Sequence, residues 1–363
     1  MRWKNLAIVG LLALAAYWPS LKTGFIWDDH FLIEGNPSIK TWEWRTVLQD
    51  FSTGIFRDPA SLDFYRPLLS FVNRINYSVS GNNPLGYHVL NLFLHATNAM
   101  LVASLVEALG FSSSIAFLVA ALFAVHPVIV QNLIMVVGRD ELMSFGFLLG
   151  AMLFLVRPVR PAMVGGLLLY LMALLSKESA IVLVVLLPLL FWARRQWTGA
   201  GTRILSVAMI TTLYLGWHHY LMGRILPPLP WKLIGLFLVE GFPQVICHYI
   251  GLAFWPWDLY TDRILDPPGP NWFLYLGGVL LWFGALLRKR NRLAWILSLW
   301  FAISLLPKMA LTISNSYLHD HWLYPILWIV LIPPALFIGK GWSSGHSTVK
   351  ILSRVGFVTI VVF

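Results

Sequence analysis

The sequence predicts an all-α polytopic membrane protein: a bundle of about 11 transmembrane helices with a large first extracytoplasmic loop that carries interfacial helices. Three observations lead to this fold class. Of the 363 residues, 58% are hydrophobic and 12% are charged, and the mean hydropathy is +0.72. Apolar runs recur along the chain, and clusters of Lys and Arg separate many of them. A soluble domain cannot bury that much apolar surface, so the excess must face lipid.

The candidate spans are apolar runs bounded by Gly, Pro and charged residues. A straight span needs about 20 residues, so the shorter runs must borrow flanking residues. The runs lie near residues 5–20, 87–109, 113–135, 141–156, 162–175, 180–193, 203–219, 232–255, 271–287, 293–306, 321–338 and 351–363.

The basic residues set the orientation of the spans, because cytoplasmic loops of membrane proteins are rich in Lys and Arg. The clusters that we interpret as cytoplasmic are Arg2/Lys4, Arg157/Arg160, Arg194/Arg195/Arg203, Arg288/Lys289/Arg290/Arg292 and Lys340/Lys350. With a cytoplasmic N-terminus, the segments expected outside are 21–86, 136–141, 176–179, 218–231 and 307–320. Outside means the periplasm, the outer face of a cell membrane, or the lumen of the ER in a eukaryote.

The number of membrane crossings before the basic run 288–292 decides whether one apolar run can be a span. If 232–255 crossed the membrane once, the basic run 288–292 would lie outside. We therefore expect 232–255 to be re-entrant or interfacial, a fold-back that the sequence Gly241-Phe242-Pro243 would suit. The last run, 351–363, is short enough to be a truncated last span. The whole chain, 1–363, is expected to form a single transmembrane domain.

Net charge and cysteine content give limited information about function. The formal net charge is +10, but the basic residues gather in the expected cytoplasmic loops, so nucleic acid is not an expected partner. Cys247 is the only cysteine, which rules out an internal disulfide. At the N-terminus, Ala13-Leu14-Ala15 resembles a signal-peptide cleavage site, but it lies inside the apolar run; an uncleaved first span is favoured.

The large outside loop, 21–86, opens with "FIWDDHFLIEGNP", in which Asp28, Asp29 and His30 are adjacent. Two neighbouring carboxylates just beyond an apolar span are candidates for acid–base chemistry. Binding of a divalent ion is the alternative, although two adjacent acids without a spaced third are a weak metal signature. Further on, "TWEWRTVLQDF" is expected to form an interfacial helix.

Polar residues also recur inside a predicted span. In "YHVLNLFLHATNAMLV", His88, Asn91, His95 and Asn98 fall on one narrow stripe of a helix. The stripe must face the bundle interior or a wet cavity. Interhelical hydrogen bonds that hold the bundle together explain it as well as a binding role does. A metal shared by His88 and His95 is not expected, because seven helical residues separate them by ~10 Å.

The expected outer ends of the spans carry further polar groups. They are His126 and Gln131, Arg139 and Glu141, Lys177 and Glu178, Arg224 and Arg263, and His319, Asp320 and His321. Each acid–base pair alone is explained by anchoring of a helix end at the lipid headgroups. Together, on the same side as the paired aspartates, they predict a polar cavity.

Several ordered stretches resemble one family. They are "GFIWDDHFLIEGNPSI", "YRPLLSFVNRINYSVSGNNPLGYHVLNLFLHATNAMLV", "ALFAVHPVIVQNLIMVVGRDELMS", "LLSKESA" and "YLHDHWLYP". They resemble the membrane half of the transmembrane, tetratricopeptide-repeat O-mannosyltransferases, of the glycosyltransferase C (GT-C) superfamily, most closely over 21–180. Two positions depart from the family pattern: Gln131 where Glu is frequent, and His321 where Arg is frequent.

The resemblance implies an inverting glycosyltransferase that moves a sugar from a polyprenyl-phosphate donor to a hydroxyl acceptor outside the cytoplasm. The first expectation for the sugar is a mannose-like hexose, and for the acceptor a protein Ser or Thr. Its partners would be that lipid-linked sugar, a protein or glycan acceptor and membrane lipid, with no cofactor and no metal. It implicates Asp28 as the catalytic base, with Asp29 as its orienter or substitute. The other residues it implicates are Arg66, Arg139, Lys177 and Arg224 at the donor phosphate, and His30, His88, Asn91, His126, Glu141, Glu178 and Asp320 in the substrate pocket.

Two rival interpretations remain open. A transporter or flippase of a polar or lipid-linked solute would explain the polar residues inside the spans, but no repeated half is evident in the sequence. A non-catalytic scaffold would use the loop 21–86 to bind a partner. The sequence leaves open which sugar moves and whether the acceptor is a protein, a glycan or a lipid.

Overall fold

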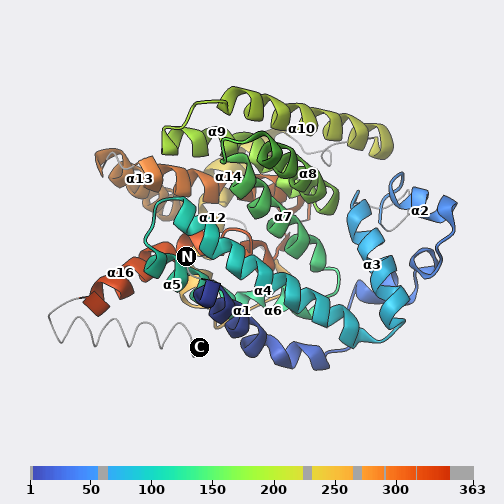
Figure 1. The fold of residues 1–363 in the computed structure, drawn as a ribbon. Coiled ribbons are helices and arrows are strands. Elements are labelled where there is room, and N and C mark those ends of the chain that lie inside the picture. Colours follow the sequence, from blue (N-terminus) through green and yellow to red (C-terminus); the bar gives the residue numbers. More distant parts are fainter. Residues whose placement is uncertain are drawn as a thin grey trace. The chain divides into compact units, whose positions relative to one another are not determined.

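The computed structural model describes residues 3–55, 64–223, 231–264, 272–289, 292–315 and 317–343. Helices dominate these ranges, and the one strand pairing is two residues long on each side (Figure 1). The chain divides into two compact units, Met1–Ile225 and Leu226–Phe363. The expected single transmembrane domain 1–363 stays a prediction.

The N-terminal unit contains ten α-helices and several short helical turns within the described ranges. The helices are α1 Trp3–Tyr17, α2 Trp44–Asp50, α3 Pro67–Ser80, α4 Pro84–Ala108, α5 Ser113–Val125, α6 Val130–Ile134, α7 Arg139–Leu155, α8 Arg160–Ser176, α9 Leu183–Arg194 and α10 Ala200–Met222. The turns are η1 Trp18–Lys22, η2 His30–Glu34, η3 Pro37–Lys40, η4 Pro127–Ile129 and η5 Glu178–Val182.

Capping residues and small residues shape this unit. The Asn83 side chain accepts the Leu85 N–H at the start of α4, and Pro84 occupies the first turn, where it loses no hydrogen bond. Helix α4 packs on α1, α5 and α7, and α7 packs on α8 (Figure 1). A Cβ at Gly166 of α8 would lie 2.7 Å from Leu155 of α7. Glycine is therefore required for this close helix contact.

The C-terminal unit is also helical. Its elements are α11 Trp231–Leu236, η6 Phe237–Gly241, α12 Phe242–Phe254, β1 Arg263–Ile264, α13 Trp272–Lys289, α14 Arg292–Asn315, β2 Tyr317–Leu318, η7 Asp320–Leu323, α15 Leu327–Val330 and α16 Ile332–Ser343. The two short strands are antiparallel, with Arg263 opposite Leu318 and Ile264 opposite Tyr317.

Four helical stretches of the described residues are long and apolar enough to cross a membrane: Trp3–Lys22, Pro84–Ala108, Ile234–Phe254 and Arg292–Met309. A bent pair, Ser113–Val125 with Pro127–Ile134, makes a fifth if it is one span. An all-α membrane protein is thus confirmed. The count of about 11 transmembrane helices, the orientation and the sidedness stay predictions.

Some expected segments differ in detail. The run 113–135 bends by 52° at Pro127, because proline disfavours helical conformation in the residue before it. In the run 232–255, a π-helical turn ends at Gly241 and α12 follows at once, so the chain does not fold back at this glycine. An interfacial position for this run stays a prediction. The loop 21–86, expected to carry interfacial helices, contains α2 and α3; their position at the membrane interface stays a prediction. The last run, 351–363, lies outside the described residues.

Candidate functional site

The turn that contains the two adjacent carboxylates is held in place by Asp29. Its carboxylate accepts hydrogen bonds from the backbone N–H groups of Ile26 (3.2 Å), Val136 and Val137 (both 3.0 Å). Asp29 is fully buried. Burial raises the pKa of this carboxyl, and the three N–H donors partly offset the rise. Asp29 therefore ties residues 26–29 to the segment just before α7.

Asp28 occupies a different position in the same turn. It is half-buried, and its backbone carbonyl accepts the N–H groups of Phe31 and Leu32 at 3.1 and 2.8 Å. The preceding Trp27 has φ +52°, in the left-handed region that residues other than glycine seldom adopt. Such strain persists only where the surrounding structure enforces it. The anchoring of Asp29 is one contact that can enforce it here.

The segment that Asp29 holds leads directly into α7. The carbonyls of residues 136–137 accept the N–H groups of Arg139 and Asp140, each at 3.1 Å. The carboxylate turn therefore lies next to the N-terminus of α7, which carries the charged sequence Arg139-Asp140-Glu141. A helix N-terminus presents a partial positive charge, which favours the acids in that first turn.

Five charged side chains gather around Arg66, and we call them the Arg66 cluster: Arg66, Asp140, Glu141, Lys177 and Glu178. Arg66 holds both oxygens of Glu178, with Nε and Nη2 donating at 3.1 and 2.8 Å, and its Nη1 donates to Asp140. Lys177 Nζ lies 3.1 Å from Asp140 and 2.9 Å from Glu141. All members are buried except Glu178, whose side chain is 35% exposed.

The Arg66 cluster contains three carboxylates and two cations. Burial alone would lower the pKa of Arg66 and of Lys177, but the neighbouring carboxylates raise both. Burial would raise the pKa of Glu178, but Arg66 outweighs it and lowers that pKa to about 2. Arg66, Lys177 and Glu178 therefore remain ionised at neutral pH. Buried charges that share several partners are costly to break, so they fix the local geometry.

The ion pairs join distant elements instead of neighbouring residues. Sequence adjacency suggested pairs within Arg139/Glu141 and Lys177/Glu178. In the structure Lys177 contacts Glu141 instead, and Glu178 contacts Arg66, which is 112 residues away. The cluster thus connects the start of α3, the start of α7 and the turn η5.

Arg139 is a second buried cation, and it has a different environment. Its guanidinium donates to the side-chain oxygens of Asn91 (2.9 Å), Asn73 (2.7 Å) and Asn76 (2.9 Å), and to the carbonyl of Tyr87 (3.0 Å). No carboxylate of the described ranges forms an ion pair with it, and burial lowers its pKa to about 10. Four of its N–H groups are therefore used in joining α3, α4 and α7. Its contact with a donor phosphate stays a prediction.

The polar stripe of α4 faces the protein interior, as the sequence predicted. Each side chain bonds a backbone carbonyl in the segment 124–142. The bonds run from His88 to Leu133 (3.2 Å), Asn91 to Met135 (3.1 Å), His95 to Ala124 (3.1 Å) and Asn98 to Leu142 (2.8 Å). These contacts are interhelical hydrogen bonds that stabilise the packing of α4 on its neighbours. A role of His88 and Asn91 in a substrate pocket stays a prediction.

Aromatic rings border the Arg66 cluster. Tyr65 precedes Arg66 in the chain, and its ring lies 6.3 Å from Tyr214 and 6.1 Å from His218, both of α10. Trp217 Nε1 donates to the Tyr65 hydroxyl at 2.9 Å. We call Tyr65, Tyr214 and His218 the aromatic wall. These three residues were not predicted from the sequence, although aromatic and His residues near the end of α10 were a signal.

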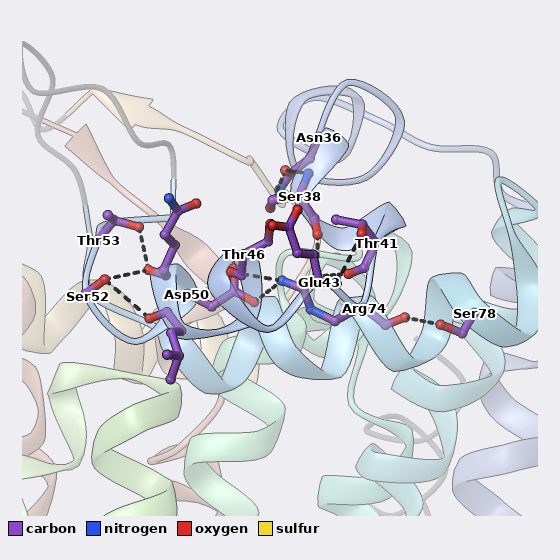
Figure 2. A network of polar contacts seen from close by, with 12 residues as sticks. Asn36, Ser38, Thr41, Glu43, Thr46, Asp50, Ser52, Thr53, Arg74 and Ser78 are labelled. Atoms are coloured by element: carbon purple, nitrogen blue, oxygen red, sulfur yellow. Dashed lines mark hydrogen bonds and ion pairs between the residues drawn. The ribbon is translucent and has the colours of Figure 1, made fainter.

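Arg74 holds the segment 36–50 on α3 (Figure 2). It is fully buried. Its guanidinium donates to the carbonyls of Ser38 and Thr41 and to the carboxylate of Asp50. The segment includes α2, on which Trp44 and Leu48 are exposed. Exposed apolar side chains are typical of the interfacial helix expected here.

Asp320 lies in the C-terminal unit. Its carboxylate accepts the Tyr260 N–H at 2.7 Å, and it lies 3.3 Å from His248 Nε2 and 3.4 Å from Arg263 Nη2. Burial would raise its pKa, but these partners lower it. The neighbouring His319 pairs with Asp262 at 2.7 Å. Asp320 is thus the centre of an ion-pair group within its own unit.

The remaining predicted site residues are placed as follows. His30 is exposed and contacts Glu34 within η2. His126 is buried, and its Nδ1 accepts the Val128 N–H at 3.3 Å. Arg224 lies outside the described residues. Over the ranges that the structure describes, no three His, Cys, Asp or Glu side chains are grouped as metal ligands.

The comparison with known proteins covers about half of the chain. No protein-family model matches it. It is 32% identical over 160 residues to human Protein O-mannosyl-transferase TMTC3, 44% of this chain and 17% of that protein. It is 34% identical over 188 residues to Drosophila melanogaster Protein O-mannosyl-transferase Tmtc1, 50% of this chain and 22% of that protein. It is 30% identical over 172 residues to human Protein O-mannosyl-transferase TMTC1, 45% of this chain and 20% of that protein. The chain thus matches less than a quarter of the length of these relatives.

Proposed function

We propose that the protein is a membrane glycosyltransferase that moves a mannose-like hexose from a polyprenyl-phosphate donor to a Ser or Thr hydroxyl of a protein. The observation that carries the proposal is the placement of Asp28. It stands half-buried in a turn that Asp29 fixes against the start of α7, and α7 supplies Asp140 and Glu141 to the Arg66 cluster. The names of the similar proteins support a transferase and do not favour a transporter.

Asp28 acts as the general base in this proposal. The acceptor oxygen attacks the anomeric carbon, and the bond between that carbon and the phosphate oxygen breaks. The acceptor proton passes to the Asp28 carboxylate, and the electron pair leaves with the lipid phosphate. Asp29 is a positioning residue, because its oxygens are occupied by three backbone N–H groups.

The departing phosphate needs cations, and Arg66 and Lys177 are the two that the cluster offers. Three carboxylates surround them, so a phosphate would meet net negative charge. Glu178 is the most exposed of these carboxylates. In our proposal the phosphate displaces Glu178 from Arg66 and takes over its bidentate contact. The site faces the extracytoplasmic side, because the loop that carries Asp28 follows a first span with a cytoplasmic N-terminus.

The test is sugar transfer by the purified protein in lipid nanodiscs. A radiolabelled polyprenyl-phosphate mannose and a Ser/Thr-rich peptide serve as substrates. Asp28→Asn is expected to lower the rate by about 10²–10⁴-fold, the usual contribution of a general base, without lowering yield. Glu43→Gln, an exposed acid of the same loop, is the matched control and should transfer normally.

Two outcomes would contradict the proposal. Full transfer by Asp28→Asn would remove Asp28 from the role of base. Absence of transfer by the wild-type protein, combined with uptake of the labelled lipid-linked sugar into vesicles, would favour transport over catalysis.

A further inference from the structure

One buried hydroxyl of the aromatic wall has no partner. Tyr214 is 5% exposed, and its hydroxyl makes no hydrogen bond with any residue that the structure describes. Nearby tyrosines are satisfied: the Tyr170 hydroxyl lies 2.6 Å from Thr211 Oγ1, and the Tyr65 hydroxyl donates to the Phe51 carbonyl at 3.0 Å. A buried hydroxyl without a partner destabilises a fold. Such a group calls for a partner from outside the described residues, either a ligand or a water molecule.

The surroundings of this hydroxyl define the kind of group it can bind. The ring of Tyr214 lies 6.3 Å from that of Tyr65 and 6.0 Å from that of His218. The charges of Glu178 and Arg66 act on the Tyr214 hydroxyl. Two neighbours of the hydroxyl, His218 and Glu178, are only partly buried. The site thus combines flat apolar faces with hydrogen-bonding groups.

A hexose ring has the matching chemistry. Its C–H faces pack on aromatic rings, and its hydroxyl groups both donate and accept hydrogen bonds. The Arg66 cluster also places the wall next to the cations to which we assign the donor phosphate. A sugar attached to that phosphate would therefore reach the wall.

We propose that Tyr214 is a specificity-determining residue whose hydroxyl binds a hydroxyl group of the transferred hexose, with Tyr65 and His218 packing against the ring. This inference rests on the proposed function, since it names where the donor sugar lies. It adds a residue of α10 to a proposed site otherwise built from the start of α3, the start of α7, the turn η5 and the carboxylate turn.

The test compares Tyr214→Phe with Tyr170→Phe. Both variants remove one buried hydroxyl from neighbouring tyrosines. Tyr214→Phe removes an unpaired group, so the unfolding midpoint should stay equal or rise; Tyr170→Phe breaks a hydrogen bond, so the midpoint should fall. For polyprenyl-phosphate mannose, kcat/KM should fall by about 5- to 10-fold in Tyr214→Phe, the worth of one hydrogen bond, and should not change in Tyr170→Phe.

Donors whose mannose lacks one hydroxyl group make the test specific. In the wild type, one deoxy-mannose donor should react about 5- to 10-fold more slowly than mannose, and Tyr214→Phe should abolish that difference. The inference is overturned if Tyr214→Phe discriminates the deoxy donors as the wild type does, which would indicate that water occupies the site.

Binding separates this inference from the proposed function. The Kd of polyprenyl-phosphate mannose and of polyprenyl phosphate is measured in nanodiscs, without an acceptor. Weaker binding of the mannose lipid alone in Tyr214→Phe supports the sugar contact even if no transfer occurs. Equal weakening of both lipids, or of neither, contradicts it. Binding of neither lipid by the wild type contradicts the proposed function.

Discussion

Arg66 donates hydrogen bonds to both carboxylate oxygens of Glu178, at 3.1 Å from Nε and 2.8 Å from Nη2. The two residues are 112 positions apart in the sequence, and the contact fixes the start of α3 against η5. Paired bonds of this kind are both stronger and more directional than a single ion pair. The pair is also the part of the Arg66 cluster closest to solvent, which makes it open to titration.

Stability should depend on pH through Glu178. Its folded pKa is about 2, below the ordinary value of 4.5, so its contribution is complete above pH 4.5 and is lost as the pH falls through about 2. We expect a contribution of about 1 to 2 kcal/mol, since solvent screens the 35% exposed side chain. Thermal unfolding between pH 2 and 6 should show that loss in the wild type and not in Glu178→Gln. An identical pH profile for both proteins would contradict the assignment.

Arg139→Lys should destabilise the N-terminal unit. The four N–H bonds of Arg139 go to neutral oxygens, and a lysine ammonium cannot reproduce that planar arrangement. We expect a loss of about 2 to 4 kcal/mol of unfolding free energy, measured by denaturant titration in detergent. Arg45→Lys, at an exposed position, serves as the control and should be near neutral. Equal stability of the two variants would show that the bonds of Arg139 contribute little.

The Arg74–Asp50 pair should behave as a coupled unit (Figure 2). Arg74→Met leaves the buried Asp50 carboxylate without its cation, at a cost of about 3 to 5 kcal/mol. Asp50→Leu added to that variant should restore part of the loss, because no charge is then left buried. Limited proteolysis of residues 36–50 gives the readout, with fastest cleavage in the single variant. Additive effects of the two substitutions would argue against the pairing.

Gly138→Ala should disturb the turn that receives Asp29. A Cβ at Gly138 would lie 2.8 Å from the carbonyl oxygen of Asn132 and 2.9 Å from its Cα, and backbone cannot yield as a side chain can. We expect a loss of about 1 to 3 kcal/mol. Gly216→Ala, where nothing lies within 4 Å, should be neutral or slightly stabilising in its helix. Comparable midpoints for the two variants in a thermal scan would contradict the clash.

The sequence was informative about features that depend on the residues of a single helix or turn. Hydropathy predicted the all-α membrane class, and the spacing of His88, Asn91, His95 and Asn98 predicted the buried face of α4. Adjacent acids were enough to mark the turn at Asp28, but not to separate a half-buried candidate base from a buried anchor. That difference depends on the N–H groups of residues 136–137, which no local pattern indicates.

Contacts between distant elements were not predictable in this way. Asn73, Asn76 and Asp140 were missed because their partners lie between 63 and 74 positions away. Tyr214 was missed for a further reason: an aromatic residue on an apolar helix is ordinarily packing, and only the absence of a hydrogen-bond partner within the described ranges distinguishes it.

The hydrogen bonds of α4 have a consequence for biosynthesis. All four polar side chains of the stripe bond carbonyls that come later in the chain, from Ala124 to Leu142. When α4 reaches the membrane, those partners have not yet inserted beside it, so the polar side chains of the new helix lack their hydrogen bonds until the following segments arrive. We therefore expect the N-terminal unit to integrate as one block, and a chain cut between α4 and α6 to be recognised by quality control as misinserted.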